Sequence, residues 1–148
     1  MSKLLARIQE DVKVAMKARE KERVGVLRML HAAMKDAAIA KRAELDEDEA
    51  LKIVMSYAKK REEAISEARK AGREDMAAKE EAELEIVRGY LPEPLSDGAL
   101  EAMVLAAIAE IGADSMKQMG QVMKLCTERA AGRADGSRIS SLVRAKLG

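Results

Sequence analysis

The chain contains no tryptophan and no phenylalanine, and only two of its 148 residues are tyrosines. Proteins that bind unpaired bases or sugars by stacking need aromatic side chains on their surface. The composition therefore excludes a stacking surface. A single cysteine, Cys126, also excludes an intrachain disulfide bond, and this predicts a reducing, cytoplasmic location.

Long apolar runs are missing as well. The longest, residues 102–109, is far shorter than a membrane span. The first residues include Glu10 and Asp11 and have no apolar central stretch, so they resemble neither a secretory signal nor a transit peptide. We therefore expect no contact with a membrane.

Proline and glycine are scarce, with two and nine copies, whereas strong helix formers dominate the composition. Apolar residues recur at helical spacing in segment after segment, which predicts an all-α fold. The expected helices cover roughly residues 4–16, 24–41, 46–71, 75–90, 97–111, 115–131 and 137–147. Ser2 is a candidate cap for the first of them.

The third helix carries the clearest local signals. Asp46 and Glu49 have the spacing of a capping box, and Gly72 follows as a stop. Residues 46–71 would extend for about 39 Å as a helix. Because the next helix follows after a short turn, the two are predicted to pack as a long antiparallel hairpin.

The fourth helix, from about Asp75 to Tyr90, has an apolar side and an acidic side. We expect Met76, Lys79 or Glu80, Leu84 and Val87 to share the inner side. The side chains expected on an exposed acidic face are Glu80, Glu81, Glu83 and Glu85.

Pro92 and Pro94 interrupt helical structure twice within three residues, and this is the strongest boundary in the chain. We predict an N-terminal helical domain, 1–91, which contains the hairpin. The second domain, 92–148, is predicted to be a small C-terminal three-helix bundle, with Ser96, Ser115 and Asp135 or Ser137 as helix starts.

The net charge is only +1, but the charges are grouped. Residues 1–43 hold eleven basic and five acidic side chains, and residues 44–91 hold nine basic and fourteen acidic ones. Residues 92–114 hold no basic and five acidic side chains, and residues 115–148 hold seven basic and two acidic ones. Either the two basic segments form a surface that binds a polyanion, or segments of opposite charge attract one another and help the parts of the chain to pack together.

Few residues in the chain suit catalysis. His31 is the only histidine and lies on or beside an apolar stripe, where it is either a general base or ligand, or a packed or edge imidazole hydrogen-bonded to a helix neighbour. Cys126 falls on a buried stripe, which is typical of an inert thiol. The sequence has no spacing typical of a zinc site, a calcium loop or a phosphate-binding loop. We predict no metal, no cofactor and no catalytic residue.

The segment from Gly132 to Gly136 is the one turn whose composition suits an anion. Two glycines at a helix start can expose backbone N–H groups, and several cations lie near it in sequence. The alternative is that both glycines only shape the turn, with Asp135 as the helix cap.

Five segments in order resemble the GatB/YqeY family, whose members are similar to the C-terminal tail of the GatB component of the glutamyl/aspartyl-tRNA amidotransferase. The similarity covers nearly the whole chain. The matching residues are Arg28, Gly72–Met76, Tyr90–Ser96, Met119–Met123 and Gly132–Gly136.

The resemblance implies two all-helical domains and a family label of carbon–nitrogen ligase activity with glutamine as amido donor. In the large enzyme the chemistry lies outside the tail, which helps to hold tRNA. The resemblance therefore implies a tRNA-holding role, and whether the chain has any enzymatic activity stays open.

Three hypotheses follow from the sequence. The first is a module that binds tRNA or another structured RNA through phosphate contacts. The second is a helical protein–protein interaction module that uses the long hairpin. The third is an enzyme that takes nitrogen from glutamine. For the first, the predicted RNA-binding residues are Lys117, Lys124, Arg129, Gly132, Arg133, Gly136, Arg138 and Arg144.

Overall fold

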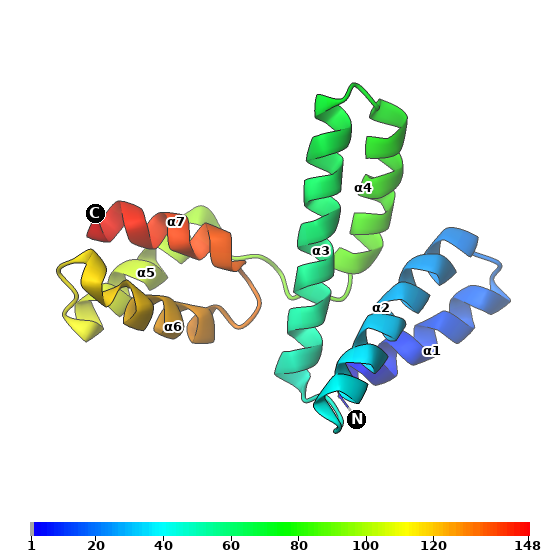
Figure 1. Cartoon of the computed structure of the whole chain (residues 1–148), viewed down its shortest axis with the longest axis horizontal. Helices are drawn as coiled ribbons and strands as arrows, with labels where there is room; N and C mark the ends of the chain where they lie inside the picture. The colour runs from blue at the N-terminus through cyan, green and yellow to red at the C-terminus, as the bar shows by residue number, and fades with distance from the viewer. Residues whose placement is uncertain (1) are drawn as a thin grey trace. The chain divides into compact units, whose positions relative to one another are not determined.

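A computed structural model describes residues 2–148 and confirms the all-α fold, with no strand in that range (Figure 1). The helices are α1 (Lys3–Lys17), α2 (Lys21–Lys41), α3 (Glu47–Lys70), α4 (Glu74–Arg88), α5 (Asp97–Ile111), α6 (Met119–Ala130) and α7 (Gly136–Leu147). A 3₁₀ turn, η1 (Met116–Gln118), precedes α6. None of these helices combines the length and apolar character that a bilayer crossing requires.

The chain divides into two compact units, one that ends at Leu91 and one that runs from Pro92 to Gly148. The first unit contains two helical hairpins. α1 packs on α2, and α3 packs on α4 over much of their length. Ile8, Leu27, Leu30 and Val54 are fully buried in the one core to which both hairpins contribute. Burial of each such side chain contributes about 1.5–3 kcal/mol to folding.

The second unit is built from α5, α6 and α7 around one small core. Val104, Val122, Cys126 and Val143 are fully buried there. Each helix contributes to this core and contacts the other two, so a unit of 57 residues has one shared apolar centre.

Local signals placed four helix starts correctly, one of them that of α7, which Asp135 caps. The Ser2 hydroxyl accepts a hydrogen bond from the Leu5 N–H, and the Ser96 hydroxyl accepts one from Ala99. Asp46 and Glu49 form the complete capping box. These caps were predictable because each partner lies within three residues of the other.

Two sequence predictions are wrong. Ser115 makes no capping hydrogen bond, and α6 begins four residues later, at Met119, because the intervening residues form the 3₁₀ turn η1. Met76 is 45% exposed, whereas its neighbour Ala77 is fully buried. The inner stripe of α4 therefore begins at Ala77.

Candidate nucleic-acid interface

The predicted RNA-binding residues lie on η1, α6, α7 and the turn between the two helices. The acidic side chains of α5 neutralise part of this set. Arg129 forms an ion pair with Glu110. Arg138 lies 2.8 Å from the Asp97 carboxylate. Lys146 of α7, which is outside the predicted set, lies 2.9 Å from Glu101. The third and fourth charge groups of the sequence thus attract each other within the second unit.

Three of the predicted cations form neither an ion pair nor a side-chain hydrogen bond among residues 2–148, whereas a fourth, Arg133, keeps its charge but is hydrogen-bonded to the neutral Glu93 carbonyl. Lys117, on η1, Lys124, on α6, and Arg144, on α7, are all exposed. Their side chains form no ion pair with any residue in 2–148. Lys124 is two residues from Val122 and two from Cys126, which places it on the side of α6 opposite the buried stripe.

The turn between α6 and α7 is held by hydrogen bonds to the segment before α5 and by Asp135. Gly132 has φ +83°, a left-handed conformation that glycine adopts without strain. The Arg133 carbonyl accepts from the Leu95 N–H at 2.8 Å, and the Arg133 guanidinium donates to the Glu93 carbonyl at 2.8 Å.

Asp135 caps α7, because its carboxylate accepts a hydrogen bond from the Arg138 N–H at 2.8 Å. The negative charge that this helix start favours is therefore supplied by the chain itself. Gly136 is the first residue of α7 and does not have a positive φ. This geometry favours the interpretation in which the turn is structural.

Neither of the two side chains considered for catalysis is placed for it. The His31 imidazole is half-buried, and its Nε2 lies 3.2 Å from Nε2 of Gln9 on α1, so it bonds to a neighbouring helix. Cys126 is fully buried, and this burial raises the pKa of its thiol. The two residues belong to different units. Residues 2–148 contain no group of three or more metal-ligating side chains suited to a metal ion.

A polar network inside the first unit was not predicted from the sequence. Arg61 of α3 lies 2.6 Å from a Glu80 carboxylate oxygen and 2.8 Å from Glu83 Oε2. It also donates to the Tyr57 hydroxyl at 2.5 Å, and that hydroxyl donates to the Met29 sulfur. All three charged side chains are largely shielded from solvent.

The prediction that Glu83 lies on an exposed acidic face is therefore wrong, and Glu80, which the sequence assigned to both sides of the helix, lies on the inner side. Both turn toward α3, because Arg61 offers them a countercharge there. Burial by itself lowers the pKa of Arg61, but its bonds with Tyr57 and Glu80 and the nearby Glu83 charge outweigh that effect and raise it. The guanidinium thus stays charged, and the network is a charged clamp between α3 and α4.

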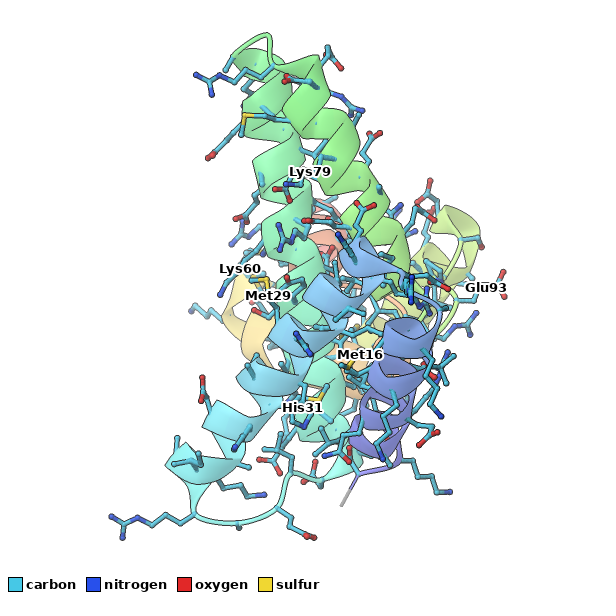
Figure 2. The ribbon with its side chains drawn as sticks, turned by 90° about the vertical axis from the view of Figure 1, so that its right-hand side faces the viewer. Met16, Met29, His31, Lys60, Lys79 and Glu93 are labelled. Atoms are coloured by element: carbon cyan, nitrogen blue, oxygen red, sulfur yellow. The ribbon has the colours of Figure 1, made fainter. Side chains whose placement is uncertain are left out.

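Two open grooves border this network. Both are lined by Met29, which is 53% exposed and is labelled in Figure 2. One lies between α2 and α3, and the other between α2 and α4. The first is lined by Met29, Ala32, Ala33, Asp36, Tyr57, Lys60, Arg61 and Ala64. The second is lined by Lys21, Glu22, Gly25, Val26, Met29, Lys79 and Glu83.

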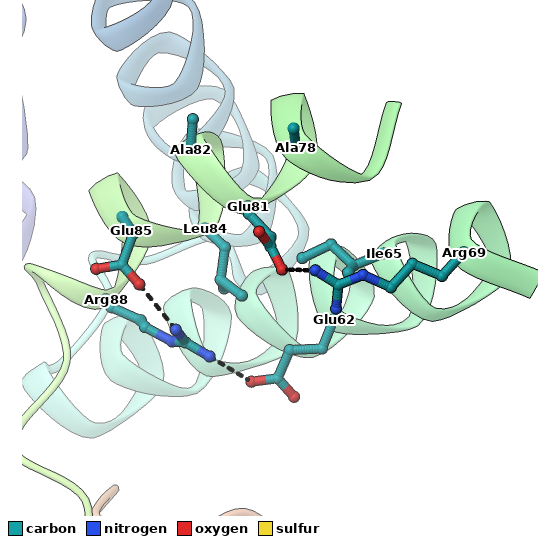
Figure 3. Close-up of a pocket in the computed structure, with 9 residues that line it drawn as sticks. All are labelled: Glu62, Ile65, Arg69, Ala78, Glu81, Ala82, Leu84, Glu85 and Arg88. Carbon is teal, nitrogen blue, oxygen red and sulfur yellow. Dashed lines mark hydrogen bonds and ion pairs between the residues drawn. The ribbon is translucent and has the colours of Figure 1, made fainter. Parts of the chain in front are cut away.

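A further groove follows the α3–α4 hairpin, and its charges are matched internally (Figure 3). Arg69 forms an ion pair with Glu81. Arg88 lies 2.8 Å from Glu85 and 3.7 Å from Glu62. Because these cations are paired within the groove, they help to hold α3 against α4 and leave little free charge for a ligand.

The geometry defines a two-unit helical protein with an unevenly neutralised basic surface. The chain belongs to the YqeY-like family, whose sequence profile, described as "Yqey-like protein", matches residues 5–147. This confirms the resemblance inferred from the order of its motifs.

Two relatives are similar over much of their length. "Altered inheritance of mitochondria protein 41, mitochondrial" of Pyrenophora tritici-repentis is 29% identical over 132 residues, covering 86% of this chain and 73% of the relative. "Uncharacterized protein C22F3.15" of Schizosaccharomyces pombe is 31% identical over 94 residues, covering 64% of this chain and 76% of the relative.

Proposed function

We propose that this chain is an accessory module that holds tRNA, or another structured RNA, and catalyses no reaction of its own. Membership of the YqeY-like family supports the proposal through the similarity of this family to the tRNA-holding tail of the amidotransferase. The observation that carries it is the free charge of Lys117, Lys124 and Arg144 in a unit whose other cations are mostly committed.

Such a module would bind by phosphate contacts and by shape. The chain has almost no aromatic surface on which a base could stack, so unpaired bases would add little affinity. Binding through phosphates releases counterions, and the affinity would therefore fall steeply as salt is added.

The test is a titration of the full chain with a tRNA transcript at several salt concentrations. The triple variant Lys117→Ala, Lys124→Ala, Arg144→Ala is expected to lower the salt slope by roughly two to three, at about 0.9 per phosphate contact. The matched control is Arg129→Ala, Arg138→Ala, Lys146→Ala, which removes the same charge from cations already paired with α5. We expect a smaller change in slope for the control.

Salt-independent binding by the unmodified chain would refute the proposal, as would an unaltered slope in the first variant.

The absence of turnover is tested separately. We expect the chain to release no glutamate when it is incubated with glutamine, ATP and mischarged tRNA. The buried thiol of Cys126 and the imidazole of His31 bonded to Gln9 support this expectation. Glutamate release by the purified chain would show that it is an enzyme.

A cytoplasmic location is part of the same proposal, since a lone buried thiol suits a reducing compartment. One relative carries the word "mitochondrial" in its name. Localisation of a tagged full chain to an organelle would overturn the cytoplasmic assignment without affecting RNA binding.

The second candidate function is a protein–protein interaction module, which the exposed Met29 between two grooves favours. Methionine side chains adapt readily to a partner surface. A protein partner that survives nuclease treatment and is lost in the Met29→Glu variant would favour this function over RNA binding.

A further inference from the structure

The exposed side of α2 carries a regular row of cations. Lys21, Arg28 and Lys35 are spaced by seven residues, so each lies about 10.5 Å along the axis from the last and is rotated by only about 20°. All three are exposed. We call these three side chains the α2 ridge.

The charge of the ridge is not neutralised by the part of the chain that the structure describes. Lys21 and Lys35 form no ion pair there, and Arg28 contacts only the neutral sulfur of Met16 on α1, at 3.5 Å. The carboxylates next in sequence, Glu22 and Asp36, line the grooves toward α4 and α3. Lys21 lines the groove toward α4 together with Glu22 and Glu83, whereas Arg28 and Lys35 line neither groove.

α1 adds a further cation beside the ridge. Contacts of Gln9 with His31 and of Met16 with Arg28 identify the side of α1 that meets this side of α2. Lys13 lies four residues after Gln9 and three before Met16, which places it on that same side. Figure 2 shows Met16 and His31 along the line where the two helices meet. Lys13 is exposed and has no ion-pair partner among residues 2–148.

We infer that the α2 ridge, together with Lys13, binds the phosphates of double-helical RNA, as a second contact surface in the first unit. This inference rests on the proposed function and adds residues outside the predicted interface. A straight row of evenly spaced cations on a rigid helix fits a polyanion whose charges are also evenly spaced. The small side chains of Gly25 and Ala32 allow a sugar–phosphate backbone to approach α2 closely.

A lipid surface fits the ridge less well. A helix that lies on a membrane needs an apolar face to insert below the headgroups. The apolar face of α2 is already used, because Val26, Leu27, Leu30 and Met34 are buried in the core of the first unit. On the exposed side of α2 the large apolar side chains are Met29 and Ile39, which lie ten residues apart and therefore form no continuous stripe.

The experiment compares two charge-matched double variants of the full chain, titrated with a tRNA transcript and with a short RNA duplex. Arg28→Ala, Lys35→Ala removes two cations of the α2 ridge. Lys52→Ala, Lys70→Ala removes two exposed cations of α3 that have no ion-pair partner among the described residues. We expect the ridge variant to lose about tenfold in affinity for both RNAs and to lower the salt slope by about one to two. The α3 variant should change little, and Arg28→Lys, Lys35→Arg should restore binding.

Equal losses in the two Ala variants would overturn the inference and leave the proposed function standing. Failure of the unmodified chain to bind either RNA would overturn both. Vesicles that contain anionic lipid are the second probe. If the ridge variant loses vesicle binding but keeps RNA binding, the ridge is a lipid contact and the inference is wrong.

Discussion

At the residue scale, Tyr90 joins the end of the first unit to α1. It is only 4% exposed, its hydroxyl donates to the Asp11 carboxylate at 2.5 Å, and the Arg7 guanidinium lies 4.6 Å from its ring centre. Arg7 also donates to the Gly89 carbonyl at 3.1 Å. Burial and the Asp11 carboxylate raise the pKa of Tyr90 to about 12.

This shift predicts a loss of stability at alkaline pH. An unfolded tyrosine titrates near about pH 10, so between roughly pH 10 and 12 the unfolded chain releases a proton that the folded chain retains. The stabilising contribution is complete below about pH 10 and disappears as the pH rises through about 12. In Tyr90→Phe this contribution is missing at every pH.

The measurement is the free energy of unfolding in urea for the unmodified chain and for Tyr90→Phe, at a series of pH values. The advantage of the unmodified chain should shrink as the pH rises from about 10 to about 12. With two tyrosines and no tryptophan, tyrosinate absorbance also reports the titration directly. A constant difference between the two chains across that range would contradict the assigned pKa.

Which residues could be predicted from the sequence depends on how far away their partners lie. Ser2, Ser96 and Asp46 were placed correctly because a cap is a contact within three residues. Glu83 was misplaced and Glu80 was left ambiguous because their partner, Arg61, lies on another helix. An analysis of hydrophobic periodicity treats every carboxylate as exposed. It cannot detect a carboxylate that forms an ion pair between two packed helices.

At the element scale, the C-terminus of α6 carries a local strain. Ala131 ends the helix with φ +47°, in the left-handed region, and it is exposed. A side chain in that region costs about 1 kcal/mol, whereas glycine adopts it freely.

Ala131→Gly is therefore expected to stabilise the second unit by roughly 0.5–1 kcal/mol. The matched control is Ala106→Gly, in the exposed middle of α5, which should destabilise the same unit by about 1 kcal/mol. Amide hydrogen exchange at Val122 and Val143, both in the core of that unit, measures each change. Two changes of the same sign would show that the left-handed cap is not strained.

The helices themselves could be predicted from periodicity, with most bounds close to those observed, because each carries its own apolar stripe. The start of α6 could not be predicted in this way. Residues 115–118 have the composition of a helix start, but the Gln118 side chain accepts from the Asp114 N–H at 2.8 Å and η1 forms instead. The free-energy difference between a 3₁₀ turn and an α-helical start is too small to be predicted from composition.

At the scale of the whole chain, the candidate interface could be predicted only in part. The sequence located a basic segment and an acidic one, and it left open whether they attract each other. Which cations are neutralised depends on how α5 lies against α6 and α7, and that packing is set by the core around Val104, Val122 and Val143. The sequence alone therefore could not separate Arg129 and Arg138 from Lys117, Lys124 and Arg144.

This arrangement implies that α5 masks cations that could otherwise bind a polyanion. Replacing its three paired carboxylates, by Asp97→Asn, Glu101→Gln and Glu110→Gln, frees Arg138, Lys146 and Arg129. We expect the triple variant to bind tRNA more tightly than the unmodified chain. Its salt slope should steepen by up to about two to three, because each freed cation that reaches a phosphate releases further counterions.

The control neutralises three carboxylates of the same unit that form no ion pair within residues 2–148, by Glu93→Gln, Asp114→Asn and Glu128→Gln. Both triple variants gain the same net charge, but only the first exposes cations. A general field effect would raise affinity equally in the two variants and leave the salt slope unchanged. Masking by α5 requires the slope to steepen in the first variant alone, so identical titrations for the two would show that the α5 ion pairs do not limit RNA binding.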